Sequence, residues 1–348
     1  MKQRRKKKNK VRSKDWEVDP DNAYSHDLKR HRKTNTQLSA NAHKPDIPEN
    51  FEPNGVVVSH SKKWAFVQSG GEVELCIISD WIIEDNTTVI APGDRVLVDF
   101  DGEEPSVMAI APRTTKLSRM AIENSRVGEQ IFAANVDVLV VVAAAAKPDF
   151  KPGLVDRYLI AADAGGVEPV LCVNKMDLVD EAPESLQPYR DLEIPVFLTS
   201  CETGVGLNEL RSYLFDKSSV FAGHSGVGKS SILNAMEPEL DIETREVSLY
   251  NDKGVHTTTQ GRLYQLDNNI RIIDTPGIRQ LGLWQVGPEE IAYYFAEIAE
   301  AGEGCKFRDC THTHEPQCGV KEAIDGGAVS QARYDSYIRI REGMLETR

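Results

Sequence analysis

The segment 223–230 has the residue types and spacing of a loop that binds a phosphate chain. It is a complete G-x4-G-K-S motif made of Gly223, His224, Ser225, Gly226, Val227, Gly228, Lys229 and Ser230. The glycines let backbone N–H groups turn inward around a β-phosphate, and the following helix adds its positive N-terminal end. We expect Lys229 to reach the β- and γ-phosphate oxygens and the Ser230 hydroxyl to bind Mg²⁺. The motif therefore predicts a nucleoside triphosphate site.

Two polar segments further along the chain are candidates for the γ-phosphate end of this site. In the first, Asp274 closes an apolar run and is well placed to hold Mg²⁺ through water, while the Gly277 N–H can meet the γ-phosphate. In the second, 254–259, a threonine hydroxyl can complete the magnesium coordination and order a switch loop. Spacing alone does not select one of its three threonines. The alternatives are an ordinary D-T-P-G turn at 274–277 and a β-branched run that leads into the next strand.

The segment 174–177, Asn-Lys-Met-Asp, has the composition of a guanine-binding site. We expect Asp177 to accept from the N1–H and 2-amino groups of guanine, Asn174 to brace the pocket and Lys175 to lie along the ring face. Adenine offers no such paired donors, so this site rejects ATP by leaving a polar group unpaired. The next expected strand ends in two residues where a backbone N–H can meet the guanine oxygen, Ser200 and Cys201.

The base motif precedes the phosphate loop in this chain, whereas in ordinary GTPases the phosphate loop comes first and the base motif last. Joining the original termini and opening the chain elsewhere preserves the sheet, since chain termini often lie close together on the surface. The order therefore predicts a circularly permuted P-loop GTPase domain. The segment after 274–277 then continues directly into the C-terminal part, so movement there with nucleotide state could reach the cysteines at 305–318.

Three of the six cysteines lie within fourteen positions of one another, beside histidines. In a reducing compartment this crowding indicates metal binding rather than disulfides. Three thiolates and one imidazole close a tetrahedral zinc site with no position for water, which makes the site structural. The expected ligands are Cys305, Cys310, Cys318 and one histidine, for which His312 and His314 compete. Free thiols in a helical tail are the alternative.

The elements that must position these segments form two architectures. Five short β-rich runs separated by turn signals suit a small closed barrel of the OB type, although an SH3-like barrel would read similarly. These runs are 55–59, 62–68, 72–78, 94–100 and 106–111. Strands and helices then alternate, as in a doubly wound α/β domain whose ligands sit at the carboxyl ends of the strands. The strands expected there are 136–144, 169–173, 195–199, 219–222, 261–266 and 270–273, and the helices are 153–164, 207–215 and 229–236.

Charge and hydropathy place limits on the partners. Nine basic residues precede the first acid, Asp15; without them, 32 basic and 54 acidic residues leave the rest of the chain at −22. Such an arm suits contact with phosphates, and a disordered solubilising tail is the alternative. The most apolar run, 131–146, is interrupted by Asn135 and Asp137, so it predicts a buried parallel strand rather than a membrane span. No apolar segment follows the basic start as in a secretory signal, and a cytoplasmic protein without a membrane partner is expected.

Several features occur together here: the permuted order, an N-terminal barrel, G-H-S-G-V-G-K-S-S at 223–231, H-T-T-T at 256–259 and a C-x4-C-x-H-x5-C tail. In this combination the chain resembles the ribosome-small-subunit-dependent GTPase A family (RsgA, also called YjeQ) over nearly all of its length after residue 50. The resemblance implies a monomeric GTP hydrolase that acts in late maturation of the 30S subunit. It also implies that a barrel and a zinc-finger domain contact 16S rRNA, and that the small subunit stimulates hydrolysis, which is coupled to release.

The resemblance also implies roles for single residues. Thr258 matches the family's switch threonine and hence a Mg²⁺ ligand, His312 matches the fourth ligand of one structural Zn²⁺, and Ser231 extends the GTP-binding loop. The expected parts of the chain are a basic, mostly disordered arm (1–50), an OB-fold barrel (51–112), the permuted GTPase domain (113–285) and a helical zinc-binding domain (286–348).

The residue that activates water cannot be the usual glutamine. Ile278 stands after D-T-P-G, where small GTPases of the Ras type carry a water-orienting glutamine. His256 can accept a proton or hold a water near neutral pH, and the family resemblance indicates the same histidine. Lys229 and Thr258 complete the expected catalytic set, and a solvent-facing loop histidine is the alternative for His256. Two other functions stay open: an RNA-binding scaffold that only senses GTP, and a P-loop kinase or ATPase, which 174–177 disfavours.

Overall fold

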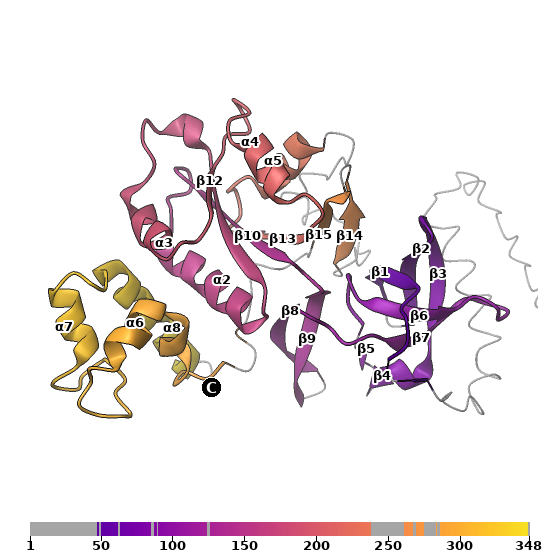
Figure 1. Ribbon diagram of the computed structural model, residues 1–348, viewed down its shortest axis with the longest axis horizontal. Helices are drawn as coiled ribbons and strands as arrows, with labels where there is room; N and C mark the ends of the chain where they lie inside the picture. The colour runs from indigo at the N-terminus through magenta and orange to yellow at the C-terminus, as the bar shows by residue number, and fades with distance from the viewer. Residues whose placement is uncertain are drawn as a thin grey trace, which may run out of the picture. The chain divides into compact units, whose positions relative to one another are not determined.

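The protein is described by a computed structural model (Figure 1). The structure describes residues 47–48, 50–61, 63–84, 87–88, 90–123, 126–237, 261–266, 269–274, 283 and 286–346. The chain divides into two compact units, Met1–Pro48 and Glu49–Arg348, and the elements below all lie in the second unit.

Five strands of the N-terminal part close into a barrel in the order β1-β2-β3-β7-β6. They are β1 (Gly55–His60), β2 (Trp64–Ser69), β3 (Glu72–Ile78), β6 (Arg95–Asp99) and β7 (Ser106–Ile110). The β3 and β7 strands are parallel and all other neighbours are antiparallel. The last barrel strand thus lies between the third and the fourth, which is the Greek-key order of the OB fold. A short helix, η1 (Asp80–Ile82), and a two-stranded ribbon, β4 (Ile83–Glu84) with β5 (Thr87–Thr88), separate β3 from β6.

A hairpin that the sequence pattern did not predict follows the barrel. It consists of β8 (Lys116–Glu123) and β9 (Arg126–Ala134). The expected strand 136–144 forms β10 (Val138–Ala144), whereas the first residues of the apolar run 131–146 belong to the end of β9. Asn135 makes the break with a left-handed φ of +51°. Its amide donates to Gly93 O at 2.9 Å, and its Oδ1 accepts from Thr114 N at 3.1 Å, so the turn is anchored to the barrel.

The central sheet has six strands in the order β12-β11-β10-β13-β15-β14, and only β14 runs antiparallel to its neighbour. Besides β10, the strands are β11 (Glu168–Asn174), β12 (Val196–Leu198), β13 (Ser218–Gly223), β14 (Arg262–Gln265) and β15 (Arg271–Asp274). All seven residues of β10 are buried, as expected for a parallel strand covered on both faces. The expected strands from 169 onward are thus present, with each end shifted by one residue.

Helices cover both faces of this sheet (Figure 1). They are α2 (Pro152–Ala164), α3 (Gln187–Asp191), α4 (Leu207–Tyr213) and α5 (Lys229–Met236), with the short 3-10 helices η2 (Met176–Leu178) and η3 (Glu184–Leu186). Leu139 and Val141 of β10 pack against α2 and α3, whereas Val138 and Val140 pack against α4 and α5. Alternate residues of one strand thus contact the two helix layers on opposite faces of the sheet. The loops at the carboxyl ends of β11 and β13 are thereby fixed on one edge of the sheet.

The C-terminal part is a small helical module. Its elements are η7 (Ile291–Tyr294), α6 (Ala296–Gly302), α7 (Gly319–Asp325) and α8 (Gln331–Glu346). Its apolar core includes Phe295 and Tyr337 and extends to Ile160 of α2. A buried ion pair lies beside this core: Arg333 of α8 contacts Asp156 of α2 at 2.5 Å and Glu297 of α6 at 2.6 Å. The module is therefore packed on helix α2 by both apolar and charged contacts.

Among the helices that the structure describes, none combines the length and the apolar character needed to cross a lipid bilayer.

Candidate functional site

The expected phosphate loop connects β13 to α5 at the carboxyl edge of the sheet. Gly228 has a φ of +97°, and a Cβ there would lie 2.3 Å from Asn174 Nδ2, so glycine is required on both conformational and steric grounds. The Lys229 ammonium donates to the carbonyl oxygens of Gly223 and His224, both at 3.0 Å. The loop is thus wrapped around its own lysine, which places a cation inside the ring of backbone groups.

Asn174 joins the base motif to the phosphate loop. It is the last residue of β11, is only 2% exposed, and its Nδ2 donates to Val227 O at 3.0 Å. Its Oδ1 accepts from Thr199 Oγ1 at 3.4 Å and from Cys201 Sγ at 3.6 Å. Burial raises the pKa of the Cys201 thiol, which keeps it a neutral donor. One buried amide therefore links three loops that are far apart in the sequence.

Lys175 makes a second connection between the same loops. Its φ of +65° turns the chain sharply after β11. Its ammonium donates to Gly226 O at 2.6 Å and also to Lys147 O, in the loop after β10. The aliphatic part of the side chain must therefore extend across the space between the base motif and the phosphate loop. This position is compatible with the expected contact to a ring face.

Asp177 is exposed and is oriented by a residue whose side-chain role the sequence did not reveal. Ser200 Oγ donates to Asp177 Oδ1 at 2.6 Å, and Ser200 Oγ accepts from Thr203 N at 3.2 Å. The expectation for Ser200 concerned only a backbone N–H toward guanine. The serine hydroxyl instead fixes the rotamer of the aspartate that is expected to read the base. A serine two residues after a strand of the same sheet was the available signal.

The γ-phosphate end of the site is described only in part. Ser230 and Ser231 lie in the first turn of α5, half-buried and exposed respectively, and Asp274 is the exposed last residue of β15. Since β15 pairs with β13, Asp274 lies on the same sheet edge as the phosphate loop. The expected residues His256, Thr258, Gly277 and Ile278 lie outside the described residues.

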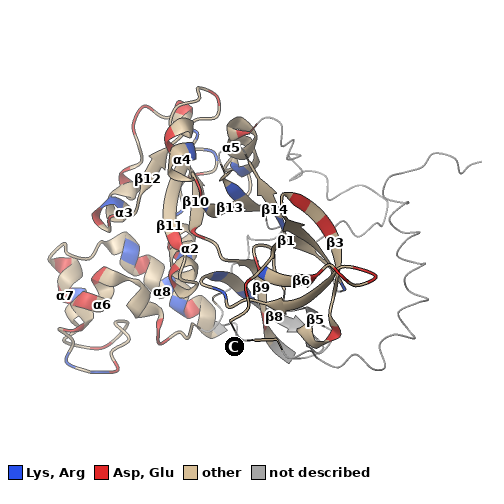
Figure 2. Cartoon of the chain, turned by 45° about the vertical axis from the view of Figure 1, so that its right-hand side comes forward, with Lys and Arg blue, Asp and Glu red and all other residues tan. Residues whose placement is uncertain are grey.

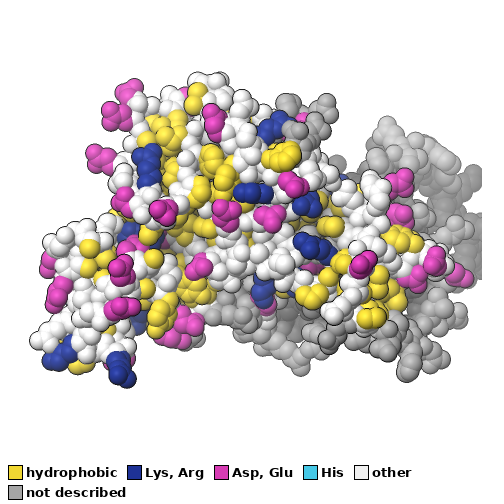
Figure 3. Space-filling model, in the orientation of Figure 1, with side chains coloured by type: hydrophobic (Ala, Val, Ile, Leu, Met, Phe, Trp, Pro, Cys, Tyr) yellow, Lys and Arg dark blue, Asp and Glu magenta, His cyan; other side chains and the backbone are white. Residues whose placement is uncertain are grey.

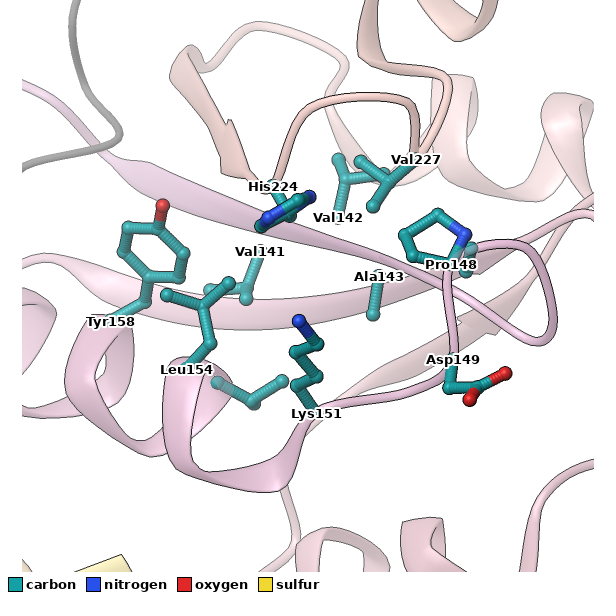
Figure 4. Close-up of a pocket in the computed structure, with 12 residues that line it drawn as sticks. Val141, Val142, Ala143, Pro148, Asp149, Lys151, Leu154, Tyr158, His224 and Val227 are labelled. Carbon is teal, nitrogen blue, oxygen red and sulfur yellow. The ribbon is translucent and has the colours of Figure 1, made fainter. Parts of the chain in front are cut away.

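A small open cleft borders the phosphate loop (Figure 4). Val141 and Ala143 of β10, Leu154 of α2 and Val227 of the loop give it a mainly apolar lining. The side chain of Lys151 points into it beneath His224. None of the base-motif residues lines this cleft. The polar loops, rather than the cleft, therefore carry the argument for a nucleotide.

The C-terminal cysteines and one histidine form a cluster of the size of a metal site. The ligand atoms of Cys305, Cys310, His312 and Cys318 all lie within 4.8 Å of one another. His312 Nδ1 lies 3.4 Å from Cys305 Sγ and 3.5 Å from Cys318 Sγ, and these two sulfurs are 3.8 Å apart. The competing residue, His314, has a side chain 85% exposed and does not join the cluster. The group can hold one metal ion.

Residues that the sequence did not single out hold the backbone around His312. The Glu315 carboxylate accepts from Thr311 N at 2.9 Å, from Thr311 Oγ1 at 2.6 Å and from Thr313 N at 3.0 Å. Burial raises the pKa of Glu315, but these hydrogen bonds outweigh it and lower the pKa to about 2. Tyr334 of α8 donates to His312 O at 2.7 Å. The cluster is therefore embedded in a second layer of hydrogen bonds, as is usual for metal ligands.

Comparison with known proteins gives consistent matches. The family model described as RsgA GTPase matches residues 110–284. Small ribosomal subunit biogenesis GTPase RsgA 1 of Vibrio vulnificus (strain YJ016) is 41% identical over 269 residues, 74% of this chain and 75% of its own. Small ribosomal subunit biogenesis GTPase RsgA of Shewanella oneidensis is 35% identical over 334 residues, which cover 91% of this chain and 92% of its own.

Two solved structures share the fold. The crystal structure of YjeQ from Thermotoga maritima has a TM-score of 0.65 and 33% identity, covering 84% of this chain and 98% of its own. YloQ, described as a circularly permuted GTPase, has a TM-score of 0.62 and 28% identity over 87% of this chain and 99% of its own. The expected fold class, a permuted P-loop domain with an OB-type barrel and a C-terminal helical module, is confirmed. The chain belongs to the RsgA GTPase family of circularly permuted GTPases.

Proposed function

We propose that this GTPase acts in biogenesis of the small ribosomal subunit, where it hydrolyses GTP during late maturation of the 30S particle. Relatives that match most of its length are named small ribosomal subunit biogenesis GTPases. The observation that carries the nucleotide part is the double connection between base motif and phosphate loop: Asn174 to Val227 O and Lys175 to Gly226 O. A guanine and a triphosphate chain bound at these two loops would belong to one molecule.

The proposed site divides its residues by the part of GTP that they meet. Asp177, oriented by Ser200, accepts from the guanine edge, and the loop from Gly223 to Ser231 surrounds the phosphates. Lys229 neutralises charge on the β- and γ-phosphates, where charge develops as the bond breaks. Ser230, Asp274 and Thr258 are the proposed groups for Mg²⁺, which supplies charge neutralisation at the phosphates when bound. The Gly277 N–H is proposed to meet the γ-phosphate.

For the attack of water we propose His256 as the positioning base. The argument comes from chemistry: Ile278 has no polar atom with which to orient a water, and an imidazole near neutral pH can hold one or accept a proton. Turnover is then slow in the free protein and rises when the small subunit fixes the segment 254–259. Equal GTP turnover by wild type and His256→Ala on 30S particles would contradict this role.

The C-terminal cluster is proposed to hold one structural Zn²⁺. With Zn–S near 2.3 Å and Zn–N near 2.0–2.1 Å, a tetrahedral ion requires S···S edges of about 3.8 Å and N···S edges of about 3.5 Å. The measured separations of 3.8, 3.4 and 3.5 Å fit those edges. Burial and then the neighbouring thiols raise the pKa of Cys310 to about 12, so zinc binding must release protons from the cluster. Four protein ligands leave no place for a reacting water, which supports a structural role.

The remaining parts of the proposal follow from the family. The OB-type barrel and the zinc module are proposed to contact 16S rRNA, and hydrolysis is proposed to be coupled to release of a monomeric protein into the cytoplasm. The proposed divisions of the chain lie after residues 50, 112 and 285, and the basic arm that precedes the barrel suits contact with phosphates.

The test is the rate of GTP and ATP hydrolysis with and without purified 30S subunits. Stimulation by 30S of GTP turnover alone would support the assembly role. Tight GTP binding without stimulation would favour a scaffold that only senses the nucleotide. Comparable ATP turnover would contradict the guanine assignment of Asp177.

A further inference from the structure

The loop between the first two cysteines of the cluster presents an aromatic ring between two basic side chains. Phe307 is 41% exposed, and Lys306 and Arg308 on either side of it are exposed as well. Lys306 Nζ lies 5.7 Å from the centroid of the Phe307 ring, within the range of a cation–π contact. Lys and Arg side chains are visible at the loop end of the C-terminal module (Figure 3). We refer to residues 306–308 as the basic-aromatic tip.

The backbone of the basic-aromatic tip is held at both ends. Cys305 and Cys310, which bracket it, both belong to the metal-sized cluster. Lys306 N donates to Gln317 O at 3.2 Å, and Cys310 N donates to Phe307 O at 3.3 Å, which closes a turn. A backbone that is fixed before binding loses little conformational entropy when a partner covers the ring that it carries.

The local charge distinguishes Phe307 from other exposed rings. In the part of the chain that the structure describes, the remaining exposed aromatic side chains have acidic or neutral neighbours in sequence: Phe100, Phe215 and Tyr293. Acidic residues are spread over much of the described chain, for instance along β3 (Figure 2). The basic-aromatic tip is thus a local exception on an acidic chain. Its one acidic neighbour within the loop is Asp309.

We propose that Phe307 stacks on an unpaired base of RNA while Lys306 and Arg308 contact the adjacent phosphates. This inference rests on the proposed function, because it names the chemistry by which the zinc module meets rRNA. Aromatic side chains stack on bases of single-stranded segments with little sequence preference, whereas the bases of a duplex already stack on one another. The tip therefore selects a loop, bulge or strand end rather than a continuous helix.

The test measures binding of the full chain to purified 30S subunits, to a mixed-sequence single-stranded RNA and to an RNA duplex. Phe307→Ala should weaken binding to 30S and to the single strand about 5- to 150-fold, and duplex binding should change little. Phe307→Trp should retain the affinity. The matched control is Phe215→Ala, which removes an exposed ring beside Asp216 and should leave all three affinities unchanged.

Two charge variants are expected to change RNA affinity in opposite directions. Lys306→Gln should weaken binding and reduce the slope of log affinity against log salt concentration by about one phosphate contact. Asp309→Asn should strengthen binding, because it removes a negative charge next to the phosphates. Unchanged zinc content and unchanged GTP turnover without 30S show that each variant is folded.

Two results would overturn the inference. One is equal binding of wild type and Phe307→Ala to 30S and single-stranded RNA. The other is weaker binding to 30S with no change on any RNA, which would assign the ring to a ribosomal protein. Failure of the proposed function looks different, because 30S subunits would then fail to stimulate GTP hydrolysis by the wild type, whatever the tip variants do.

Discussion

Replacement of Asn174 by alanine should weaken the binding of GDP and GTP by the same factor. The amide of this 2% exposed residue donates to Val227 O at 3.0 Å and so connects the base motif to the phosphate loop. Alanine leaves that carbonyl without its donor in a buried place, at a cost of about 1–3 kcal/mol. If the cost falls on the geometry of the nucleotide site, affinity drops by about 5- to 150-fold. The factor is common to both nucleotides because the contact does not involve the γ-phosphate.

The assay is titration with fluorescent GDP and a non-hydrolysable GTP analogue, together with urea unfolding. Asn135→Ala is the matched control, because Asn135 is also buried and its amide donates to Gly93 O at 2.9 Å, between barrel and hairpin. Its φ of +51° adds backbone strain in the variant, so its stability loss should be at least as large as that of Asn174→Ala. The reasoning is refuted if both variants lose stability and both bind GDP as tightly as wild type.

Three further perturbations test the C-terminal module. The carboxyl pKa of Glu315 is about 2 in the folded chain against an ordinary 4.5, so its stabilisation is complete above pH 4.5 and disappears as the pH falls toward 2. In urea unfolding with chelator present, the free energy of unfolding of Glu315→Gln should be about 1–3 kcal/mol below that of wild type at neutral pH. This difference should disappear below about pH 4, where the wild-type carboxyl is protonated too. A difference that does not change with pH would contradict this. Removal of metal should lower the melting temperature of wild type but not of Cys310→Ser, and equal responses would argue against the zinc site. Arg333→Met should cost about 3–5 kcal/mol in urea unfolding, because the buried Asp156 loses the cation that offsets its removal from water. Adding Asp156→Leu should recover part of that loss. A loss below about 1 kcal/mol would show that the pair is not desolvated.

The features that the sequence predicted well are those that depend on residues adjacent to one another in the chain. The phosphate loop needs glycine at a left-handed position, as at Gly228, and a lysine one residue later, so eight consecutive residues are enough to predict its chemistry. The buried strand β10 can be predicted because seven successive apolar residues leave it no polar face. Its start was predicted two residues too early, at 136, because apolar content alone does not show that Asn135 anchors a turn to the barrel through Gly93 O.

Contacts between distant residues were not predictable in the same way. Ser200 orients Asp177 across 23 positions, and Arg333 meets Asp156 across 177 positions. A single sequence contains no signal that pairs such residues, since each polar or charged side chain could equally well be exposed to solvent. The hairpin β8–β9 is a different case, because two runs flank Asn124-Ser125, and that polar pair was an available turn signal.

The packing of helix α2 changes the view of how the nucleotide site and the metal cluster are connected. The sequence suggested a covalent route through the segment after 274–277. In the structure, the same helix lines the cleft beside His224 with Leu154 and carries Asp156 into the buried ion pair with Arg333. The α8 helix that bears Arg333 also holds the backbone of His312 through Tyr334. Two packed helices, α2 and α8, thus connect the cleft beside the phosphate loop to the cluster, and the contact between them includes a desolvated charge pair. Such pairs tolerate misalignment poorly, because their attraction must offset the cost of removing both charges from water.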